Sequence, residues 1–498
     1  MITAMPEHRP HPLSLALLAV AVLAGSSPLP GTAAEPAIRL IVRGDDMGSS
    51  QASNEAAVRC FRDGVMRDVE LMAVGPWFPQ AARLLRENPG LDVGLHLALT
   101  SEWDNVKWRP LTAAPSLVGK DGTFHPMVWP HPHYGKEGAL KEQPWRLDEI
   151  ERELRAQIEL TMREVPQLSH LSMSKIVTSV AALLLLEEAR FKLDDPVGDY
   201  LPELAHMKVM TGGTAEKPLL ADAKNPITIK HLFTHTSGLT YDFGDGTIDR
   251  IYKAARIWES PSLDEFVRRV STVPLVHEPG ERFTYSVSID VLGALVERLS
   301  GRSLPDFMSD RLFRPLGMKD TGFFLPEAAR PRVASVYEQG PAGRLQPAKG
   351  LRDGEPVTAL HTAPTLASGG GGLYSTTGDY ARLMQMLLNG GQLDGVRVLS
   401  RKTVELMMAN HLNHMPRATY SSNESEGFGL GGSVRVDLAK GGVLGSVGQF
   451  GWTGAATTYA NLDPQEKTLA LLFVQHFPYD EHKIFWRFST LFYQAIVN

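Results

Sequence analysis

The stretch Leu171–Leu201 constrains the fold of this chain more than any other. It opens with the sequence Ser-Met-Ser-Lys at 172–175, continues as a mostly apolar run from Ile176 to Leu186, and closes at Asp194-Asp195-Pro196. A helix cannot easily continue through that proline. We therefore predict a buried helix with Ser172 at its mouth. Lys175 lies three residues further on, so the hydroxyl and the amine share one helix face.

This serine–lysine pair has two interpretations. A lysine pressed against an apolar wall can lose its proton near neutral pH, and the neutral amine can then accept the proton of Ser172. Alternatively, Ser172 caps the helix and Lys175 extends its amine to solvent. A chain of this length should contain roughly one Ser-x-x-Lys sequence by chance. The choice between the two interpretations therefore depends on the other motifs of the chain.

Composition excludes several classes of function. The chain has 498 residues, enough for two or three domains, and a net charge of -6 with 21% charged residues. This balance predicts no nucleic-acid partner and no attraction to an anionic membrane surface. The single cysteine, Cys60, excludes an intrachain disulfide framework and makes a thiolate metal cluster implausible.

The N-terminus has the pattern of an export signal. Arg9 precedes the apolar run Leu13–Gly25, and small residues follow at 32–34. We predict a signal peptide over residues 1–34, a mature chain that begins near Glu35, and a periplasmic or secreted protein. An uncleaved anchor is the alternative. No later stretch is apolar for long enough to span a bilayer.

The next segment predicts strands with acidic residues and a histidine. Ile38–Val42 is expected to be a short strand that leads into Asp45 and Asp46, and Asp92–Thr100 a strand with His96 in its middle. A helix over 54–62 and a strand over 69–74 are expected between them. Two carboxylates at the end of a strand favour a metal site. The alternative is a capped loop and a core histidine.

Three motifs give this segment a family resemblance. The sequences RGDDMGSSQASNEA, GLHLALTSEW and VPQLSHLS occur in order between residues 43 and 172. On these motifs, residues 35–171 resemble the YdjC-like carbohydrate deacetylases. The resemblance implies a distorted α/β barrel that acts on N-acetylated sugars through a divalent metal, Zn or Mg. It implies Asp45 as general base and Asp46 and His96 as ligands. Only about half a barrel is present, so the third ligand would have to be His170 or be missing.

After Ser172 the pattern changes. We expect a short helix and polar loop over 226–240, a helix after Tyr285 that buries one face, and a glycine loop that leads into a helix over 368–391. Antiparallel strands are predicted at Ser446–Phe450, Ala456–Leu462 and Thr468–Gln475, and a closing helix at 482–497.

Five motifs in this half, SMSK, HTSGL, YSV, SGGGGLYSTTGDYARL and GWTGAATT, occur in the order found in a known superfamily. Residues 172–498 resemble the serine β-lactamases and penicillin-binding proteins, in the class C-like branch that contains esterases and D-aminopeptidases. The implied fold is α+β, an antiparallel sheet flanked by helices plus a helical region, so the whole chain is expected to be α/β plus α+β. The resemblance implies Ser172 as nucleophile, Lys175 as its partner and Tyr285 as general base and proton donor. It implies the amides of Ser172 and Ala455 as oxyanion hole, and no cofactor.

Departures from this pattern bear on substrate and folding. Val287 stands where asparagine is common, and Trp452-Thr453-Gly454 stands where the family has Lys-Thr-Gly. Both changes remove polar partners of a β-lactam, which favours small-molecule ester, peptide or cell-wall-like substrates. The family also has a helix and two strands before its Ser-x-x-Lys. In this chain that position is occupied by deacetylase-like sequence.

The leading hypothesis is therefore an exported serine hydrolase of the class C-like type, with an acyl-enzyme mechanism. A metal-dependent carbohydrate deacetylase is the second hypothesis. The third is an inactive fusion product that at most binds ligand.

Overall fold

The computed structural model describes residues 43–66, 68–88, 91–165, 169–170, 173–324, 366–415 and 424–496, with parts of 326–348. The predicted signal peptide, the predicted strand Ile38–Val42 and the nucleophile candidate Ser172 lie outside the described residues, as does the side chain of His170. No helix of the described part is both long and apolar enough to cross a membrane.

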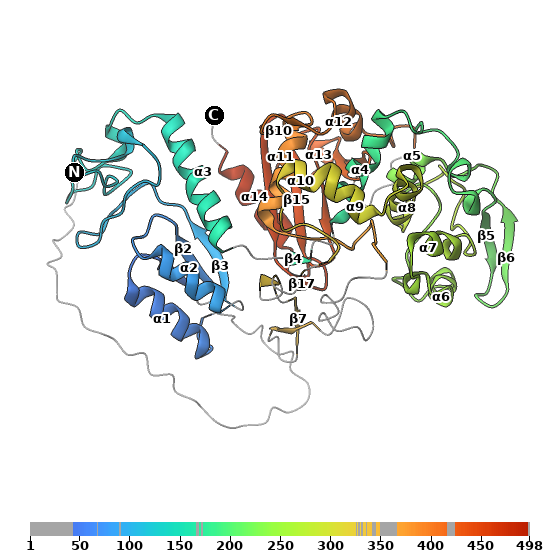
Figure 1. Ribbon diagram of the computed structural model, residues 1–498, viewed down its shortest axis with the longest axis horizontal. Helices are drawn as coiled ribbons and strands as arrows, with labels where there is room; N and C mark the ends of the chain where they lie inside the picture. Colours follow the sequence, from blue (N-terminus) through green and yellow to red (C-terminus); the bar gives the residue numbers. More distant parts are fainter. Residues whose placement is uncertain are drawn as a thin grey trace, which may run out of the picture. The chain divides into compact units, whose positions relative to one another are not determined.

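The helices and strands follow one another along the chain as drawn in Figure 1. The helices are α1 (Gln51–Arg62), α2 (Phe78–Glu87), α3 (Leu147–Glu164), α4 (Ser174–Glu187), α5 (Ile229–Phe233), α6 (Thr247–Ala254), α7 (Leu263–Val270), α8 (Ser288–Ser300), α9 (Leu304–Met308), α10 (Arg314–Leu316), α11 (Thr377–Leu388), α12 (Arg401–Met408), α13 (Leu438–Gly441) and α14 (Ile484–Gln494). The strands are β1 (Arg43–Met47), β2 (Asp68–Met72), β3 (Asp92–His96), β4 (Ser169–His170), β5 (Lys208–Gly213), β6 (Pro218–Asp222), β7 (Tyr337–Gln339), β8 (Leu345–Pro347), β9 (Tyr374–Ser375), β10 (Gln392–Leu393), β11 (Val396–Arg397), β12 (Glu426–Phe428), β13 (Ser433–Arg435), β14 (Phe450–Gly454), β15 (Thr458–Asp463), β16 (Thr468–Phe473) and β17 (His476–Phe477).

The N-terminal part contains a parallel sheet of three strands in the order β1-β2-β3. The helices α1 and α2 connect these strands, and their apolar faces form one core with β2 around Val69, Leu71 and Ala81. Such strand–helix–strand units build α/β barrels, so this part agrees with the α/β class. Three strands are a fraction of a barrel.

Two boundaries in this sheet were predicted wrongly. Asp45 and Asp46 were predicted just past the carboxyl end of a strand over 38–42, but they lie within β1 itself, which spans Arg43–Met47. His96 was expected in the middle of a strand, but β3 ends at His96. The turn that follows begins earlier than predicted because Ala98 is held by the side chain of Gln157, which bonds to both its N–H and its carbonyl.

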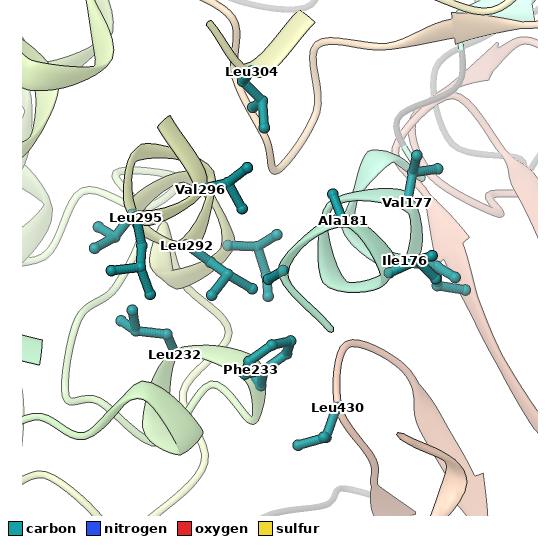
Figure 2. Packing of buried hydrophobic residues seen from close by; sticks show 14 of the residues in the cluster. Ile176, Val177, Ala181, Leu232, Phe233, Leu292, Leu295, Val296, Leu304 and Leu430 are labelled. Carbon is teal, nitrogen blue, oxygen red and sulfur yellow. The ribbon is translucent and has the colours of Figure 1, made fainter. Parts of the chain in front are cut away.

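The helix predicted from the apolar run is confirmed as α4. Every residue of α4 from Ser174 to Leu185 is buried, which matches a sequence that is apolar on all faces. Figure 2 shows Ala181 on the side of this helix toward α8, and Ile176 and Val177 on its opposite side, so the helix has buried apolar side chains on more than one face. The same hydrophobic cluster includes Leu292 and Val296 of α8, Leu232 and Phe233 of α5, Leu304 and Leu430.

The helix α8 differs from its prediction. The sequence predicted one buried face, but all residues from Ser288 to Val296 are buried. The helix packs against α4, α5, α7 and α9, so hardly any side is left for solvent. The polar residues Ser288 and Asp290 are therefore inside the protein and need partners there.

The second sheet has five antiparallel strands in the order β12-β13-β14-β15-β16. The strand predicted at Ser446–Phe450 is wrong in position, because β14 begins at Phe450 and carries the triplet at 452–454. Gly448, with φ of 92°, lies in a turn before the strand. The helices α11 and α14 pack against β16, through Tyr380 against Phe473 for α11.

Candidate active site

The lysine of the Ser-x-x-Lys motif is fixed in the first turn of α4. Lys175 is 4% exposed, and its Nζ donates a hydrogen bond of 2.7 Å to the carbonyl of Gly370. The same Nζ lies 4.8 Å from the ring centroid of Tyr285 and 5.6 Å from that of Tyr241. The amine is thus held in one place, between a backbone carbonyl and two aromatic rings.

The carbonyl that holds Lys175 belongs to a glycine loop, which is fixed in turn by α8. Asp290 Oδ1 accepts hydrogen bonds from the Gly370 N–H (3.0 Å) and from Ser368 Oγ (2.5 Å). A Cβ at position 370 would lie 2.4 Å from Asp290 Oδ2, so only glycine allows this approach. Thr178 of α4 binds the neighbouring carbonyl of Gly369 at 2.7 Å. Asp290 is therefore a positioning residue for Lys175.

Tyr285 lies just before α8, as predicted, and its hydroxyl accepts a hydrogen bond of 3.4 Å from Trp452 Nε1. Its ring is 5.5 Å from that of Trp452 and 5.3 Å from that of Tyr241. The structure therefore brings together three of the predicted site residues, Lys175, Tyr285 and Trp452. They come from α4, the start of α8 and β14.

The HTSGL motif fixes the backbone next to Tyr285. His235 is completely buried, and its Nδ1 lies 3.2 Å from both the amide nitrogen and the hydroxyl of Ser286. Burial, and then the nearby charge of Lys175, lower the pKa of His235 well below its usual value. A neutral imidazole therefore accepts the amide hydrogen of the residue next to Tyr285. The hydroxyls of Ser237, Ser286 and Ser288 continue the network at 2.7 to 2.8 Å.

An aromatic wall, defined here as Tyr241, Phe243, Trp258, Tyr285 and Trp452, lines this group. The ring of Tyr241 stacks on Phe243 (4.4 Å) and on Trp258 (6.0 Å), and it contacts Tyr285. Phe243 is 77% exposed, so the wall runs from the buried lysine to the surface. Sequence reasoning missed Tyr241, Phe243 and Trp258. The feature of the sequence that could have indicated these residues is the high frequency of aromatic residues in 241–258.

The other predicted site residues of this half lie on β14, in the turn after it and at the start of α8. Thr453 Oγ1 bonds to the hydroxyl of Tyr479 at 2.6 Å, and Gly454 is the buried end of β14. Ala455 follows at the exposed turn, where its amide is expected in the oxyanion hole. Val287 is fully buried in the main core, at the start of α8.

The N-terminal part also brings its predicted residues together. His96 Nδ1 lies 3.0 Å from Asp46 Oδ1 and 3.3 Å from Asp45 Oδ1, and one ligand atom from each residue lies within 4.8 Å of the other two. Burial raises the pKa of Asp46, and the charge of Asp45 acts in the same direction while His96 opposes it. Asp46 has a positive φ of 58°, and its carbonyl accepts bonds from Ser49 and Ser53. Two carboxylates and an imidazole are a donor set that fits a divalent cation.

Comparison with known proteins decides the family of the chain. A family model described as Beta-lactamase matches residues 169–491, well over half of the chain. This chain belongs to the beta-lactamase family. It is a serine hydrolase, and the α+β expectation for the C-terminal half is confirmed.

A second family model, described as YdjC-like protein, matches residues 39–240. The resemblance of the N-terminal half is thereby confirmed. The two matches overlap over residues 169–240, so the domain boundary at 171/172 stays a prediction.

Similar proteins include a mycobacterial protein, an esterase and a solved hydrolase structure. Protein Rv1367c of Mycobacterium tuberculosis is 38% identical over 315 residues, which cover 62% of this chain and 77% of that protein. Lovastatin esterase of Penicillium rubens is 33% identical over 298 residues, 57% of this chain and 71% of the esterase. The solved structure of EstCE1, described as a hydrolase with promiscuous acyltransferase activity, has a TM-score of 0.54 and 25% identity, and covers 66% of this chain and 84% of that one.

Proposed function

We propose that this chain hydrolyses carboxylic esters of small molecules through an acyl-enzyme on Ser172. The observation that carries the proposal is the position of Lys175 Nζ, held by Gly370 and 4.8 Å from the ring centroid of Tyr285. Lys175 lies three residues after Ser172 in the sequence, the spacing at which a lysine can act as base for a serine hydroxyl.

The reaction proceeds in two transfers. Ser172 Oγ gives its proton to the Lys175–Tyr285 pair and attacks the ester carbonyl carbon, while the amides of Ser172 and Ala455 stabilise the oxyanion. The ester C–O bond breaks, and Tyr285 protonates the leaving alcohol. Water then loses a proton to the same pair and attacks the acyl-enzyme, which releases the acid and restores Ser172.

The aromatic wall supports an ester with an apolar acyl or alcohol group. Its rings offer flat apolar surface from Phe243 inward to Trp452. At Trp452 the family's usual cation for a β-lactam carboxylate is absent, since tryptophan carries no charge. The names of the similar lovastatin esterase and of EstCE1 point to the same ester chemistry.

The test is hydrolysis of p-nitrophenyl acetate and butyrate by the full chain and by Ser172→Ala. We expect turnover by the parent and none above background by the variant. Mass spectrometry after reaction with a fluorophosphonate should place the adduct on Ser172. Hydrolysis by Ser172→Ala at the parent rate would refute the assignment.

The second serine of the motif offers a matched control. Ser174 Oγ accepts a hydrogen bond of 3.0 Å from the Leu373 N–H, so its role is to attach the glycine loop to α4. Ser174→Ala should lose some stability, about 1 to 3 kcal/mol for an unsatisfied buried donor, and keep the fluorophosphonate adduct. An adduct that disappears in Ser174→Ala and persists in Ser172→Ala would reverse the two roles.

For the N-terminal half we propose a divalent-cation site at Asp46 and His96, with Asp45 beside it as base. His96 Nδ1 is buried, and its contacts with the carboxylates of Asp46 and Asp45 at 3.0 and 3.3 Å lack the geometry of hydrogen bonds, which supports a role as ligand. A bound cation would make a coordinated water more acidic. Because the described part of the chain places three strands around the site, we expect weak binding and no acetate release from chitooligosaccharides. Zinc-dependent acetate release that His96→Ala abolishes would overturn this expectation and favour the deacetylase hypothesis.

We also propose export to the periplasm or the medium. Residues 1–34 carry the pattern that supports it. N-terminal sequencing of the protein from its natural host should begin near Glu35. A mature protein that begins at Met1 would contradict the proposal.

A further inference from the structure

A second cluster of metal-ligand residues lies after β16, outside both sites described above. His476, Glu481 and His482 each offer one ligand atom, and these atoms all lie within 4.8 Å of one another. The rings of His476 and His482 have centroids 5.1 Å apart, and His476 Nε2 is 3.8 Å from Glu481 Oε2. Two imidazoles and one carboxylate are the ligand types that zinc takes.

The buried nitrogen of His476 gives this cluster its significance. The His476 side chain is 7% exposed, and its Nε2 is buried without a hydrogen-bond partner among the described residues. A buried nitrogen without a partner is unfavourable, and it is the type of group that a bound ion satisfies. It faces Glu481, whose side chain is exposed enough to reposition.

The backbone that carries these ligands is held firmly. The His476 N–H donates to the Ala456 carbonyl at 3.0 Å, and its own carbonyl accepts from Thr457 Oγ1 at 2.9 Å. On the other side, the Asp480 N–H donates to the same Thr457 Oγ1 at 3.1 Å, and Asp480 Oδ1 caps α14. Both ends of the loop 476–482 are thus attached to the β14–β15 connection before any ion binds.

We propose that His476, Glu481 and His482 form a zinc site with three protein ligands and one open position. Bond lengths of about 2.0 to 2.2 Å place zinc ligands roughly 3.3 to 3.5 Å apart, so the side chains have to approach by about 1 Å. Glu481 and His482 are less buried than His476, so we expect these two side chains to move. Imidazole nitrogens exclude calcium and magnesium as preferred occupants, which need mainly oxygen.

The position of the site gives it a consequence for the hydrolase. The loop 476–482 also carries Tyr479, whose hydroxyl bonds to Thr453 on β14 at 2.6 Å. Zinc that links His476 to His482 would hold Tyr479 against the strand that carries Trp452. The site would therefore stabilise one edge of the aromatic wall without contact to Lys175.

The test uses the untagged full chain, freed of metal by chelation and titrated with Co²⁺ as a spectroscopic substitute for zinc. We expect visible d–d absorption typical of nitrogen and oxygen ligands, and a rise in melting temperature with added Zn²⁺. His482→Ala and Glu481→Gln should weaken Co²⁺ binding by at least about tenfold, because each removes one of three ligands. Circular dichroism checks that these surface-loop variants fold.

Two controls separate this site from other histidines. His206→Ala removes an exposed histidine and should keep the Co²⁺ spectrum. His96→Ala removes the imidazole of the weaker N-terminal candidate site and should remove only the Co²⁺ bound there. A parent chain without Co²⁺ absorption and without stabilisation by zinc would overturn the proposal. So would a spectrum that His96→Ala abolishes and His482→Ala leaves intact.

Discussion

Replacement of Asp290 by alanine should disable the site without touching any group that reacts. The carboxylate holds the Gly370 N–H and the Ser368 hydroxyl, and Gly370 in turn holds Lys175. A buried donor left without its acceptor costs about 1 to 3 kcal/mol, so two of them should lower the free energy of unfolding by roughly 3 kcal/mol, since Ser368 is only partly buried. At about 2 °C per kcal/mol for a large domain, the melting temperature should fall by about 6 °C.

The effect on rate should be larger than the effect on stability suggests. When the Gly370 carbonyl moves, Lys175 Nζ loses its anchor, and a displacement of about 1 Å in a reacting group can cost about a hundredfold in kcat. We expect Asp290→Ala to lower kcat for an aryl ester by about that factor, with little change in KM. Asp290→Asn keeps an acceptor oxygen in place, so it should recover most of both losses.

A matched control comes from another buried aspartate. Asp379 also accepts one backbone N–H, from Asp320 at 2.7 Å, and one hydroxyl, from Thr321 at 2.9 Å. Asp379→Ala should lower the melting temperature to a similar extent and leave kcat within about twofold of the parent. Calorimetry and initial rates below the melting range measure both quantities. Parent-like kcat in Asp290→Ala, or an equal loss of kcat in Asp379→Ala, would refute the positioning role.

Three further predictions follow from other residues. Burial, and then the charge of Lys230, lower the pKa of His231 to about 4, against about 6.5 in the unfolded chain. As the pH falls, the unfolded chain therefore takes up the proton before the folded chain does. His231 should not affect the free energy of unfolding above about pH 6.5, and should lower it by about 1.4 kcal/mol per pH unit between about pH 6.5 and 4. Urea unfolding at pH 7.5 and 5 measures this loss, and a His231→Gln variant that loses as much stability between the two pH values as the parent would contradict it. A chromogenic cephalosporin should have kcat/KM at least about ten- to a hundredfold below that of an aryl ester, since Trp452 cannot make the charged hydrogen bond to the β-lactam carboxylate, which is worth about 1.5 to 3 kcal/mol; equal values for the two substrates would show that the pocket is misjudged. A chain in which a family-typical helix and two strands replace residues 35–171 should melt at a higher temperature and aggregate less than the native chain in metal-free buffer, because the added strands would pair with the open edge of β16. A native chain that melts at the same temperature or higher would contradict this.

Local patterns allowed the sequence to predict the elements that hold the site. The apolar run after Lys175 identified α4, and Thr376 caps α11 through the Asp379 N–H as the capping segment predicted. Tyr285 was placed correctly just before α8. In each case the signal lies within a few neighbouring residues, which is the range over which caps and periodicity act.

The parts that were missed depend on contacts between distant segments. Asp290 binds Gly370 across 80 positions of sequence, and nothing near Asp290 indicates this partner. The burial of α8 on all sides follows from the helices packed around it, and a one-sided apolar pattern cannot reveal them. His476, Glu481 and His482 were not predicted as a group, because the predicted strand ended at Gln475 and the predicted helix began at His482. The fold of the segment between β16 and α14 brings the three side chains together.

The incomplete sheet shows which part of this hydrolase depends on the missing sequence. In the described part of the chain β16 pairs only with β15, and its other edge has no strand beside it. The helix α11 contacts Phe473 on one face, and α14 contacts Tyr459 of β15 on the other through Phe485. Helices cover side chains, but they cannot pair the backbone N–H and carbonyl groups of an open edge. The short segment before α4 pairs as β4 with β9, not with β16. The core around α4 and the anchor of Lys175 therefore need only residues after 172, so a catalytic site can form while the weakest point of the fold lies at the edge of β16.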